Sequence, residues 1–320
     1  MANRPRNELN GPHGAFEASC RKEEFALELF DRLWSRYRER VSYVSDYERI
    51  VHDSGATFVN DHIAFRTFAN QHPHTGITTI SRIFEALGYR AAGCYQFEGK
   101  HLNAVHFQHS HPCFPKLFFS ELKTWELGFA AQKAISDTLS SHRQPIADRA
   151  LTRLISLDDD KQRDWTDLMD TVLMQFHELP WELPAMEHVI ALNKESQYAA
   201  WVLVHGYNVN HFTSLINSHD VDELDDIEKT IQALQATGVP MKDHIEGEKG
   251  SKLRQSATAA VVIDVEVLDG GSKTCMPWTY AYFELAERNR IPDPATGEAV
   301  RFEGFLGPQA TNLFEMTRRS

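Results

Sequence analysis

One predicted strand near the start of the chain carries two side chains that could do chemistry together. His62 and Arg66 both lie in residues 60–68 (NDHIAFRTF), and a side-chain period of two puts them on the same face, roughly 13 Å apart. A neutral imidazole binds divalent metal ions, and the guanidinium fork of arginine matches a carboxylate. The pattern predicts a cavity for a metal and an acidic substrate, although a hydrogen-bonded histidine and a surface arginine would explain the same residues.

Two further candidate ligands stand on later predicted strands. His211 lies in residues 205–213 and Glu284 in residues 278–285. Two histidines and one carboxylate on one side of an ion leave neighbouring coordination positions open, which is typical of non-haem Fe(II) enzymes that bind an oxo acid and dioxygen. Spacing alone does not single out this triad, because no dense motif such as H-E-x-x-H is present.

Composition narrows the classes of partner. The chain has 320 residues, and its 42% hydrophobic and 24% charged residues are ordinary for a globular protein. The formal net charge of -12 disfavours nucleic acid, whereas one arginine or metal can still make a pocket attractive to an anion. No apolar run approaches a membrane span, and the four scattered cysteines indicate reduced thiols. We therefore expect a cytoplasmic protein that binds a small molecule, with neither nucleic acid nor membrane as a partner.

Hydrophobic periodicity predicts the elements that position these residues. The first half begins with a flexible tail and N-terminal helices, followed by the His62 strand, a helix closed by Gly88, and three strands (1–15, 16–52, then 89–97, 102–108 and 116–122). The second half has two strands, an acidic helix, a long strand, a turn and a partner strand (198–203, 205–213, 222–236, 258–268, 269–271 and 278–285). A helical insertion separates the halves (123–196), and a tail ends the chain (291–320).

The two halves predict a repeated module of one strand, one helix and three strands. Each module ends on a strand with a carboxylate near its end, Glu121 in the first and Glu284 in the second. This plan resembles the vicinal-oxygen-chelate superfamily, in which duplicated modules form a half-open β-barrel around a metal. We expect an α+β fold with one metal-binding domain (16–320), made of module one (about 56–122), the insertion (123–196), module two (about 197–290) and the tail (291–320).

Four short segments resemble the marker segments of the 2-oxoadipate dioxygenase/decarboxylase family, also called hydroxyglutarate synthase. They are residues 60–67 (NDHIAFRT), 119–122 (FSEL), 209–213 (VNHFT) and 282–288 (YFELAER), and the resemblance runs from about residue 25 to 305. It implies that His62, His211 and Glu284 hold Fe(II) and that Arg66 helps to hold the substrate. The implied reaction is oxidative decarboxylation and hydroxylation of a 2-oxo dicarboxylic acid, with dioxygen as co-substrate. For 2-oxoadipate the product is 2-hydroxyglutarate, which would place the enzyme in lysine breakdown.

Several other polar residues are weaker candidates. Lys100, Gln255 and Ser256 would contact the substrate, although exposed turn residues would look the same. His205 shares strand parity with His211 and would support it from behind. The remaining clustered histidines are more simply solvated loop residues (His72, His74, His106, His109 and His111).

Two alternatives stay open. A glyoxalase-type isomerase or lyase would use Glu121 as a fourth ligand, so three protein ligands favour the oxygenase and four favour the isomerase. A non-catalytic binding protein would have a cavity but take up no dioxygen. Because the affinity order of divalent metals does not favour iron, zinc or nickel can occupy such a site after purification, and the chain can form a homo-oligomer.

Overall fold

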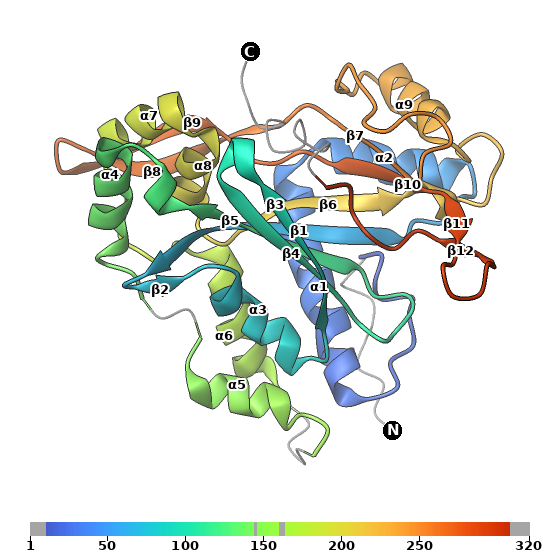
Figure 1. Ribbon diagram of the computed structural model, residues 1–320, viewed down its shortest axis with the longest axis horizontal. Coiled ribbons are helices and arrows are strands. Elements are labelled where there is room, and N and C mark those ends of the chain that lie inside the picture. The colour runs from blue at the N-terminus through green and yellow to red at the C-terminus, as the bar shows by residue number, and fades with distance from the viewer. Residues whose placement is uncertain (1–10, 144–145, 160–163, 308–320) are drawn as a thin grey trace.

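The computed structural model describes residues 11–143, 146–159 and 164–307. Its centre is a curled mixed sheet whose strands follow the order β3-β4-β5-β1-β6-β10-β7, with β2 paired to β1 (Figure 1). The strands of this sheet are β1 (Asn60–Gln71), β2 (His74–Thr75), β3 (Arg90–Phe97), β4 (Leu102–Gln108), β5 (Lys116–Lys123), β6 (Val209–Leu215), β7 (Leu253–Ala257) and β10 (Glu284–Arg288). The predicted α+β half-barrel is confirmed.

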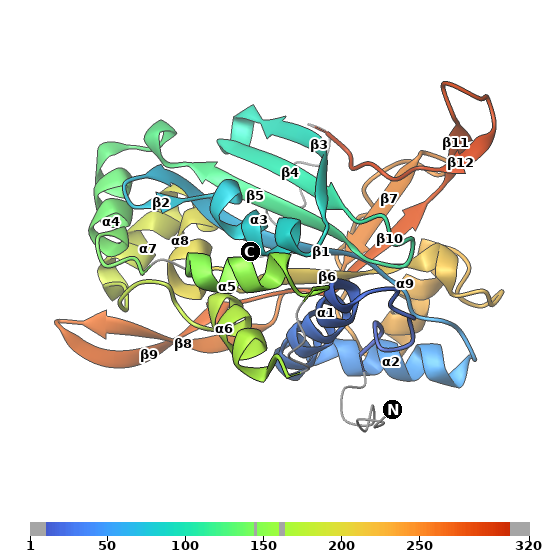
Figure 2. The same cartoon turned by 90° about the horizontal axis from the view of Figure 1, so that it is seen from below.

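Helices cover one face of the sheet and one of its ends. Figure 2 shows α1, α2, α5 and α6 on one side, with β3 and β4 curling away on the other. The helices are α1 (Arg21–Arg40), α2 (Tyr43–Asp53), α3 (Ile77–Ala86), α4 (Phe129–Leu139), α5 (Asp148–Ile155), α6 (Thr166–His177), α7 (Met186–Glu195), α8 (Gln197–His205) and α9 (Ile227–Ala236). Two hairpins project at opposite ends, β8 (Val262–Asp269) with β9 (Ser272–Thr279) and β11 (Arg290–Pro292) with β12 (Ala299–Arg301). No helix in the described ranges is long and apolar enough to cross a bilayer.

The alternation of side chains along β1 separates the core from the site. Phe65 faces the helices, where its ring lies 5.0 Å from Phe119, 5.3 Å from Phe176 and 5.7 Å from Phe84. Burying one such side chain contributes about 1.5–3 kcal/mol, so this face fixes the orientation of the strand. His62, Ala64 and Arg66 must then point to the opposite face.

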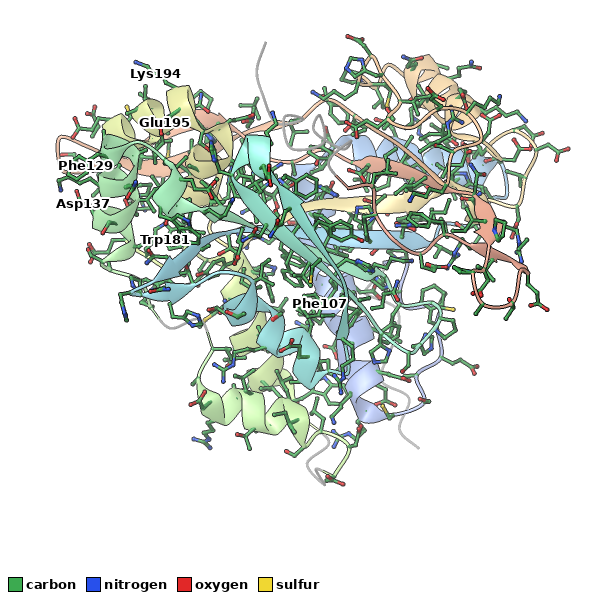
Figure 3. All side chains as sticks on the ribbon, viewed as in Figure 1. Phe107, Phe129, Asp137, Trp181, Lys194 and Glu195 are labelled. Atoms are coloured by element: carbon green, nitrogen blue, oxygen red, sulfur yellow. The ribbon has the colours of Figure 1, made fainter. Side chains whose placement is uncertain are left out.

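The remaining side chains follow the same division between core and solvent (Figure 3). Phe107 and Trp181 are buried in the interior, whereas Asp137, Lys194 and Glu195 lie on the outer helices. Phe129 at the start of α4 is 83% exposed, so the apolar core does not extend over this end of the molecule.

Both halves of the chain contribute strands to the sheet, and a local two-fold relation connects the first strand of each half. Module one runs β1-α3-β3-β4-β5, and module two contributes β6, α9, β7 and β10 to the same sheet. The antiparallel β1–β6 pairing sets His62 opposite Thr213 and Ala64 opposite His211. A two-fold rotation that places β1 on β6 carries the pair His62–Thr213 onto the pair His211–Ala64. Each histidine therefore occupies the same position in its own module.

Three predicted strands of the second half differ from the structure. The predicted partner strand 278–285 is two strands, because β9 ends at Thr279 and Glu284 begins β10, which pairs with β6 and β7 instead of β8. Residues 198–203 belong to α8, because every side chain of this short run is buried and an all-apolar run carries no strand period. The predicted long strand (258–268) begins only at Val262, as β8, and a separate strand, β7, ends just before the predicted start, at Ala257. The β8–β9 hairpin, whose turn at Gly270 and Gly271 was correctly expected, therefore leaves the sheet. Residues 241–246 run along this edge of the sheet instead, through two isolated antiparallel bridges, Met241 with Thr258 and Glu246 with Gln255 of β7.

The described part of the predicted N-terminal tail is packed rather than loose. His13 is fully buried, and its ring nitrogens lie 2.8 Å from Asp31 Oδ1 and 3.0 Å from Asn60 Oδ1. Residues 1–10 lie outside the described residues, as do residues 308–320 of the predicted C-terminal tail. The part of that tail up to residue 307 returns to the sheet and contributes to the site.

Candidate metal centre and substrate cavity

Three buried side chains from three strands meet on the face of the sheet opposite the core. His62 comes from β1, His211 from β6 and Glu284 from the first position of β10. His62 Nε2 lies 3.3 Å from both His211 Nε2 and Glu284 Oε1, and His211 Nε2 lies 3.4 Å from Glu284 Oε2. Two atoms bound to one ion at about 2.1 Å lie at most about 4.2 Å apart, so all three pairs fit around one divalent ion.

The residue before each histidine fixes the direction of its ring. Asp61 Oδ2 lies 2.7 Å from His62 Nδ1, and Asn210 Oδ1 lies 3.0 Å from His211 Nδ1. With Nδ1 engaged, each ring directs Nε2 into the cluster, as metal-binding histidines require. Neither residue was predicted, although each histidine directly follows a polar residue in the sequence, Asp61 in one half and Asn210 in the other.

Burial and hydrogen bonds determine the protonation of the cluster. Burial lowers the pKa of His211 to about 3, so its imidazole is neutral near pH 7. Burial also disfavours charged His62, but hydrogen bonds with Asp61 and Glu284 outweigh it and raise the pKa of His62. Burial opposes the Glu284 carboxylate as well, yet the two histidines and a hydrogen bond from Gln255 lower the pKa of Glu284. The cluster thus offers a carboxylate and imidazole nitrogens, which divalent transition metals prefer.

A cavity opens beside these three residues. Its empty space is about 470 Å³ when the open solvent at its mouth is included, and about 40 Å³ of it can hold the centre of a water molecule. Its lining joins the cluster to apolar side chains and one cation. Ala64 lies between His62 and Arg66 on the same face of β1, and its small methyl group takes up little of the space above the strand. The histidines and the arginine therefore line one cavity.

Arg66 stands at the end of the cavity away from the cluster. Its side chain is buried, and its guanidinium carbon lies 5.1 Å from the ring centre of Tyr198 and 5.3 Å from that of Trp201. A hydrogen bond connects it to Tyr282. Burial lowers the pKa of Arg66, but an arginine remains charged in proteins. The residue is thus a positioned cation on the same face as the histidines.

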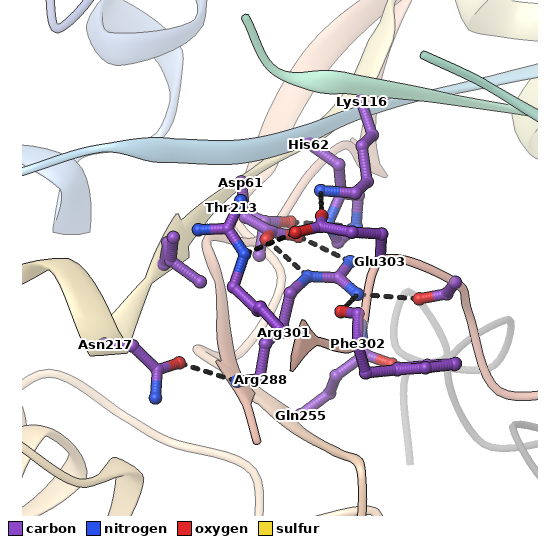
Figure 4. Close-up of polar contacts among 12 residues, drawn as sticks. Asp61, His62, Lys116, Thr213, Asn217, Gln255, Arg288, Arg301, Phe302 and Glu303 are labelled. Carbon is purple, nitrogen blue, oxygen red and sulfur yellow. Dashed lines mark hydrogen bonds and ion pairs between the residues drawn. The ribbon is translucent and has the colours of Figure 1, made fainter. Parts of the chain in front are cut away.

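The chain after β12 closes one side of the cavity. Phe305 and Leu306 line it, and the ring centre of Phe305 lies 4.9 Å from that of His62 and 4.8 Å from that of Phe118. Lys116 forms an ion pair with Glu303 in the same segment (Figure 4). The apolar roof limits the access of water to the cluster.

Arg288 connects this roof to the first histidine. Its guanidinium donates to the carbonyl oxygens of Phe302 and Gly304, at 3.1 and 2.6 Å. It also forms a fork with both carboxylate oxygens of Asp61, at 2.6 and 2.8 Å (Figure 4). Although burial would raise the pKa of Asp61, Arg288 holds it well below its usual range. No motif indicated this network, because Asp61 and Arg288 lie 227 residues apart.

Glu121, the candidate fourth ligand, does not approach the cluster. Phe118 and Ser120 of β5 line the cavity, so the strand period directs Glu121 to the opposite face. There its Oε2 accepts a hydrogen bond of 2.9 Å from the backbone N–H of Ile77, at the start of α3. The structure therefore contradicts a role for Glu121 as a metal ligand, and the residue caps a helix instead.

Of the three weaker candidates for substrate binding, one lines the cavity and two do not. Gln255 lines the cavity, and its Nε2 donates to Glu284 Oε1 at 2.6 Å. Ser256 faces the other side of β7, where its hydroxyl lies 3.3 Å from the carbonyl oxygen of His244. Lys100 lies in the turn between β3 and β4 and is not part of the cavity lining.

His205 does not support His211 as predicted. It ends α8 rather than standing on the strand, and its Nε2 lies 2.9 Å from the carbonyl oxygen of Thr279. Among the described residues, no second group of three histidine, cysteine, aspartate or glutamate side chains comes close enough to hold an ion. The histidines that the sequence analysis discounted accordingly form no such group.

Comparison with known proteins agrees with this geometry. A family model for 2-oxoadipate dioxygenase/decarboxylase matches residues 29–299. The chloroplastic 2-oxoadipate dioxygenase/decarboxylase of Arabidopsis thaliana is 29% identical over 278 residues, covering 80% of this chain and 67% of that protein.

Two solved structures share the fold. The hydroxyglutarate synthase of Oryza sativa, in complex with 2-oxoadipate, has a TM-score of 0.75 at 23% identity and covers 95% of this chain and 96% of its own. A protein of Ralstonia eutropha assigned to the glyoxalase superfamily has a TM-score of 0.77 at 23% identity, covering 90% and 88%. The match to the family model spans most of the chain, and the chain therefore belongs to the 2-oxoadipate dioxygenase/decarboxylase family of enzymes.

Proposed function

We propose that this enzyme converts 2-oxoadipate and dioxygen to 2-hydroxyglutarate and carbon dioxide at a single Fe(II) ion. His62, His211 and Glu284 hold the ion, and Arg66 holds the carboxylate of the substrate that does not react. The observation that carries the proposal is the placement of these groups, with the cluster at one end of a cavity and a buried cation at the other.

The donor set fits a divalent metal. Glu284 Oε2 is buried and accepts no hydrogen bond from any described residue, which a bound ion would remedy. When bound, Fe(II) would supply the reactivity with dioxygen and would polarise the 2-oxo acid. Because the affinity of such ligands does not favour iron, zinc or nickel could replace it during purification.

The protein's own contribution is to position the substrate and limit its access to water. Arg66 suits a forked pair with a carboxylate, and the rings of Tyr198 and Trp201 hold the guanidinium in place. Phe118 and Phe305 cover the middle of the cavity with apolar surface. A dicarboxylic acid bound in this way has its reacting end fixed at the cluster.

The glyoxalase-type alternative receives no support in the form first considered. It required Glu121 as a fourth ligand, and Glu121 faces the other side of the sheet. Three candidate ligands remain, which is the number that favours the oxygenase. Cytoplasmic location and self-association stay predictions.

Anaerobic loading with Fe(II), followed by oxygen-electrode traces with a panel of 2-oxo acids, tests the proposal. We expect equal amounts of oxygen consumed and carbon dioxide released with 2-oxoadipate, together with 2-hydroxyglutarate. A non-catalytic binding protein would bind the acids without uptake. Absence of uptake with every acid tested, by protein that has bound one iron per chain, would refute the oxygenase proposal.

A further inference from the structure

We propose that Phe118 occupies the position of a fourth metal ligand, and that its apolar side chain keeps the side of the ion toward Arg66 open for the substrate. This inference rests on the proposed metal centre and assigns Phe118 a specificity-determining role. It replaces Glu121 with a different residue as the counterpart of Glu284.

The register of the strands gives this correspondence. Ala64 and Thr213 each lie two residues after a histidine, and each pairs with the histidine of the other module, so the two residues are equivalent. In module two, Thr213 pairs with Glu284 of the parallel strand β10. In module one, Ala64 pairs with Phe118 of the parallel strand β5. Phe118 and Glu284 therefore stand at the same position of their modules and point to the same face.

An independent contact confirms the alignment of these two strands. Three residues beyond Phe118 lies Glu121, and three residues beyond Glu284 lies Glu287. Glu121 accepts the backbone N–H that begins α3, and Glu287 accepts the one that begins α9, at 2.9 and 3.0 Å. Two carboxylates with the same role in their modules fix the relative alignment, and Phe118 again matches Glu284.

The surroundings of Phe118 show what the exchange of carboxylate for phenyl achieves. Its ring lines the cavity and lies 4.8 Å from the ring centre of Phe305, between the cluster and Arg66. The next inward residue of β5, Ser120, pairs with Arg66. A carboxylate at position 118 would lie beside Ala64 in the same cavity, in the part lined by module one, where the substrate must bind.

Coordination chemistry gives the consequence. An octahedral ion with three protein ligands keeps three positions, and a 2-oxo acid that binds through its carboxylate and keto oxygens uses two of them. A fourth protein ligand on the module-one side would compete with that chelation beside Arg66. Module two retains its carboxylate, whereas module one carries the cation that a dicarboxylic substrate needs.

A rescue experiment tests the equivalence directly. Glu284→Ala should lose most of its affinity for Zn(II), measured by competition with a chelator. Adding Phe118→Glu to Glu284→Ala should restore that affinity by at least about tenfold, because the carboxylate returns to the same ion from the other module. Adding Phe118→Gln instead is the matched control, since it has nearly the same shape and no charge.

Metal-dependent stability gives a second readout in the presence of Glu284. Phe118→Glu buries a carboxylate beside a cluster that already has one, so the metal-free variant should unfold at a lower temperature than Phe118→Gln. Added Zn(II) should then raise its unfolding temperature more than that of Phe118→Gln, because tighter binding stabilises the folded state more. If Phe118→Glu does not fold, Phe118→His offers a neutral ligand for the same measurements.

The outcomes separate this inference from the proposed function. Wild-type protein that binds no divalent ion would refute the metal centre itself. Wild-type protein that binds one ion, combined with no rescue by Phe118→Glu or Phe118→His in the Glu284→Ala background, would refute the role of Phe118 alone. Rescue that is equal with Phe118→Gln would also overturn it.

Discussion

The two modules of the sheet have the same framework and contribute different chemistry. Each supplies one histidine and orients it through the preceding residue, Asp61 in module one and Asn210 in module two. Module two adds Glu284 and Gln255, so in the proposed function it supplies the metal side of the site. Module one has Phe118 in place of the carboxylate and so leaves room for the substrate.

A second pair of positions extends the contrast. Four residues after its histidine, module one has Arg66 and module two has Leu215. The charge therefore appears in the module that lacks the carboxylate ligand. Duplication thus brings the three candidate ligands together, and under the proposed function the differences between the copies would make one side of the ion a binding site for an acid.

The largest expected effect comes from removing a histidine. In His211→Ala, bound metal should fall far below one ion per chain after Fe(II) or Zn(II) loading, because two donors remain in the cluster. His52→Ala, at an exposed histidine, is the control and should keep full occupancy. Elemental analysis after gel filtration measures this, and full occupancy of His211→Ala would remove module two's histidine from the site.

The next effect tests the substrate side of module one. Arg66→Gln should reduce kcat/KM for 2-oxoadipate by roughly 100-fold, since loss of a buried charge pair costs about 2–5 kcal/mol. For 2-oxohexanoate, which lacks the far carboxylate, the reduction should be much smaller. Leu215→Ala, at the corresponding position of module two, should treat the two acids alike. An equal reduction for both acids in Arg66→Gln would contradict a role in recognising the second carboxylate.

Smaller effects should distinguish the two residues that orient the histidines. Asp61→Ala and Asn210→Ala should each weaken Zn(II) binding by about 10–100-fold, as expected for partners of metal ligands. Asp61→Ala should show the larger loss, because it also leaves the buried Arg288 without its carboxylate. Chelator competition measures both variants. A larger loss in Asn210→Ala would reverse the assigned order.

The smallest effect concerns the two helix caps. Glu121→Gln and Glu287→Gln should each lower the free energy of unfolding by about 0.5–2 kcal/mol, the usual cost of weakening a helix cap. Glu121→Gln should leave Zn(II) affinity unchanged. Urea unfolding and chelator competition on the same samples test this pair. A clear loss of metal affinity in Glu121→Gln would return that residue to the list of ligands.

The sequence allowed the convergent residues to be predicted, but not their register. His62, His211 and Arg66 stand on strands with clear side-chain parity, so their faces could be inferred. Glu121 was paired with Glu284 because each is a carboxylate near the end of the last predicted strand of its module. Strand pairing shifts that correspondence by three positions, and no local pattern encodes the pairing partner.

The other differences have the same physical origin. The run 198–203 is apolar on all sides, so its burial was predictable and its helical form was not. The roof formed by Phe305 depends on Arg288, whose side chain bonds to two separate parts of the chain, Asp61 and the segment from Phe302 to Gly304. Such long-range ion pairs leave no spacing to detect.

Arg288 also affects how small molecules can enter and leave the cavity. Segment 302–306 accepts two of its hydrogen bonds, and Asp61 accepts a separate fork from the same guanidinium. Displacing the segment to admit a substrate would break the first set and leave the second intact. The ring of His62, held by Asp61, would then keep its orientation during each turnover, so substrate entry and product release would leave a bound ion in place.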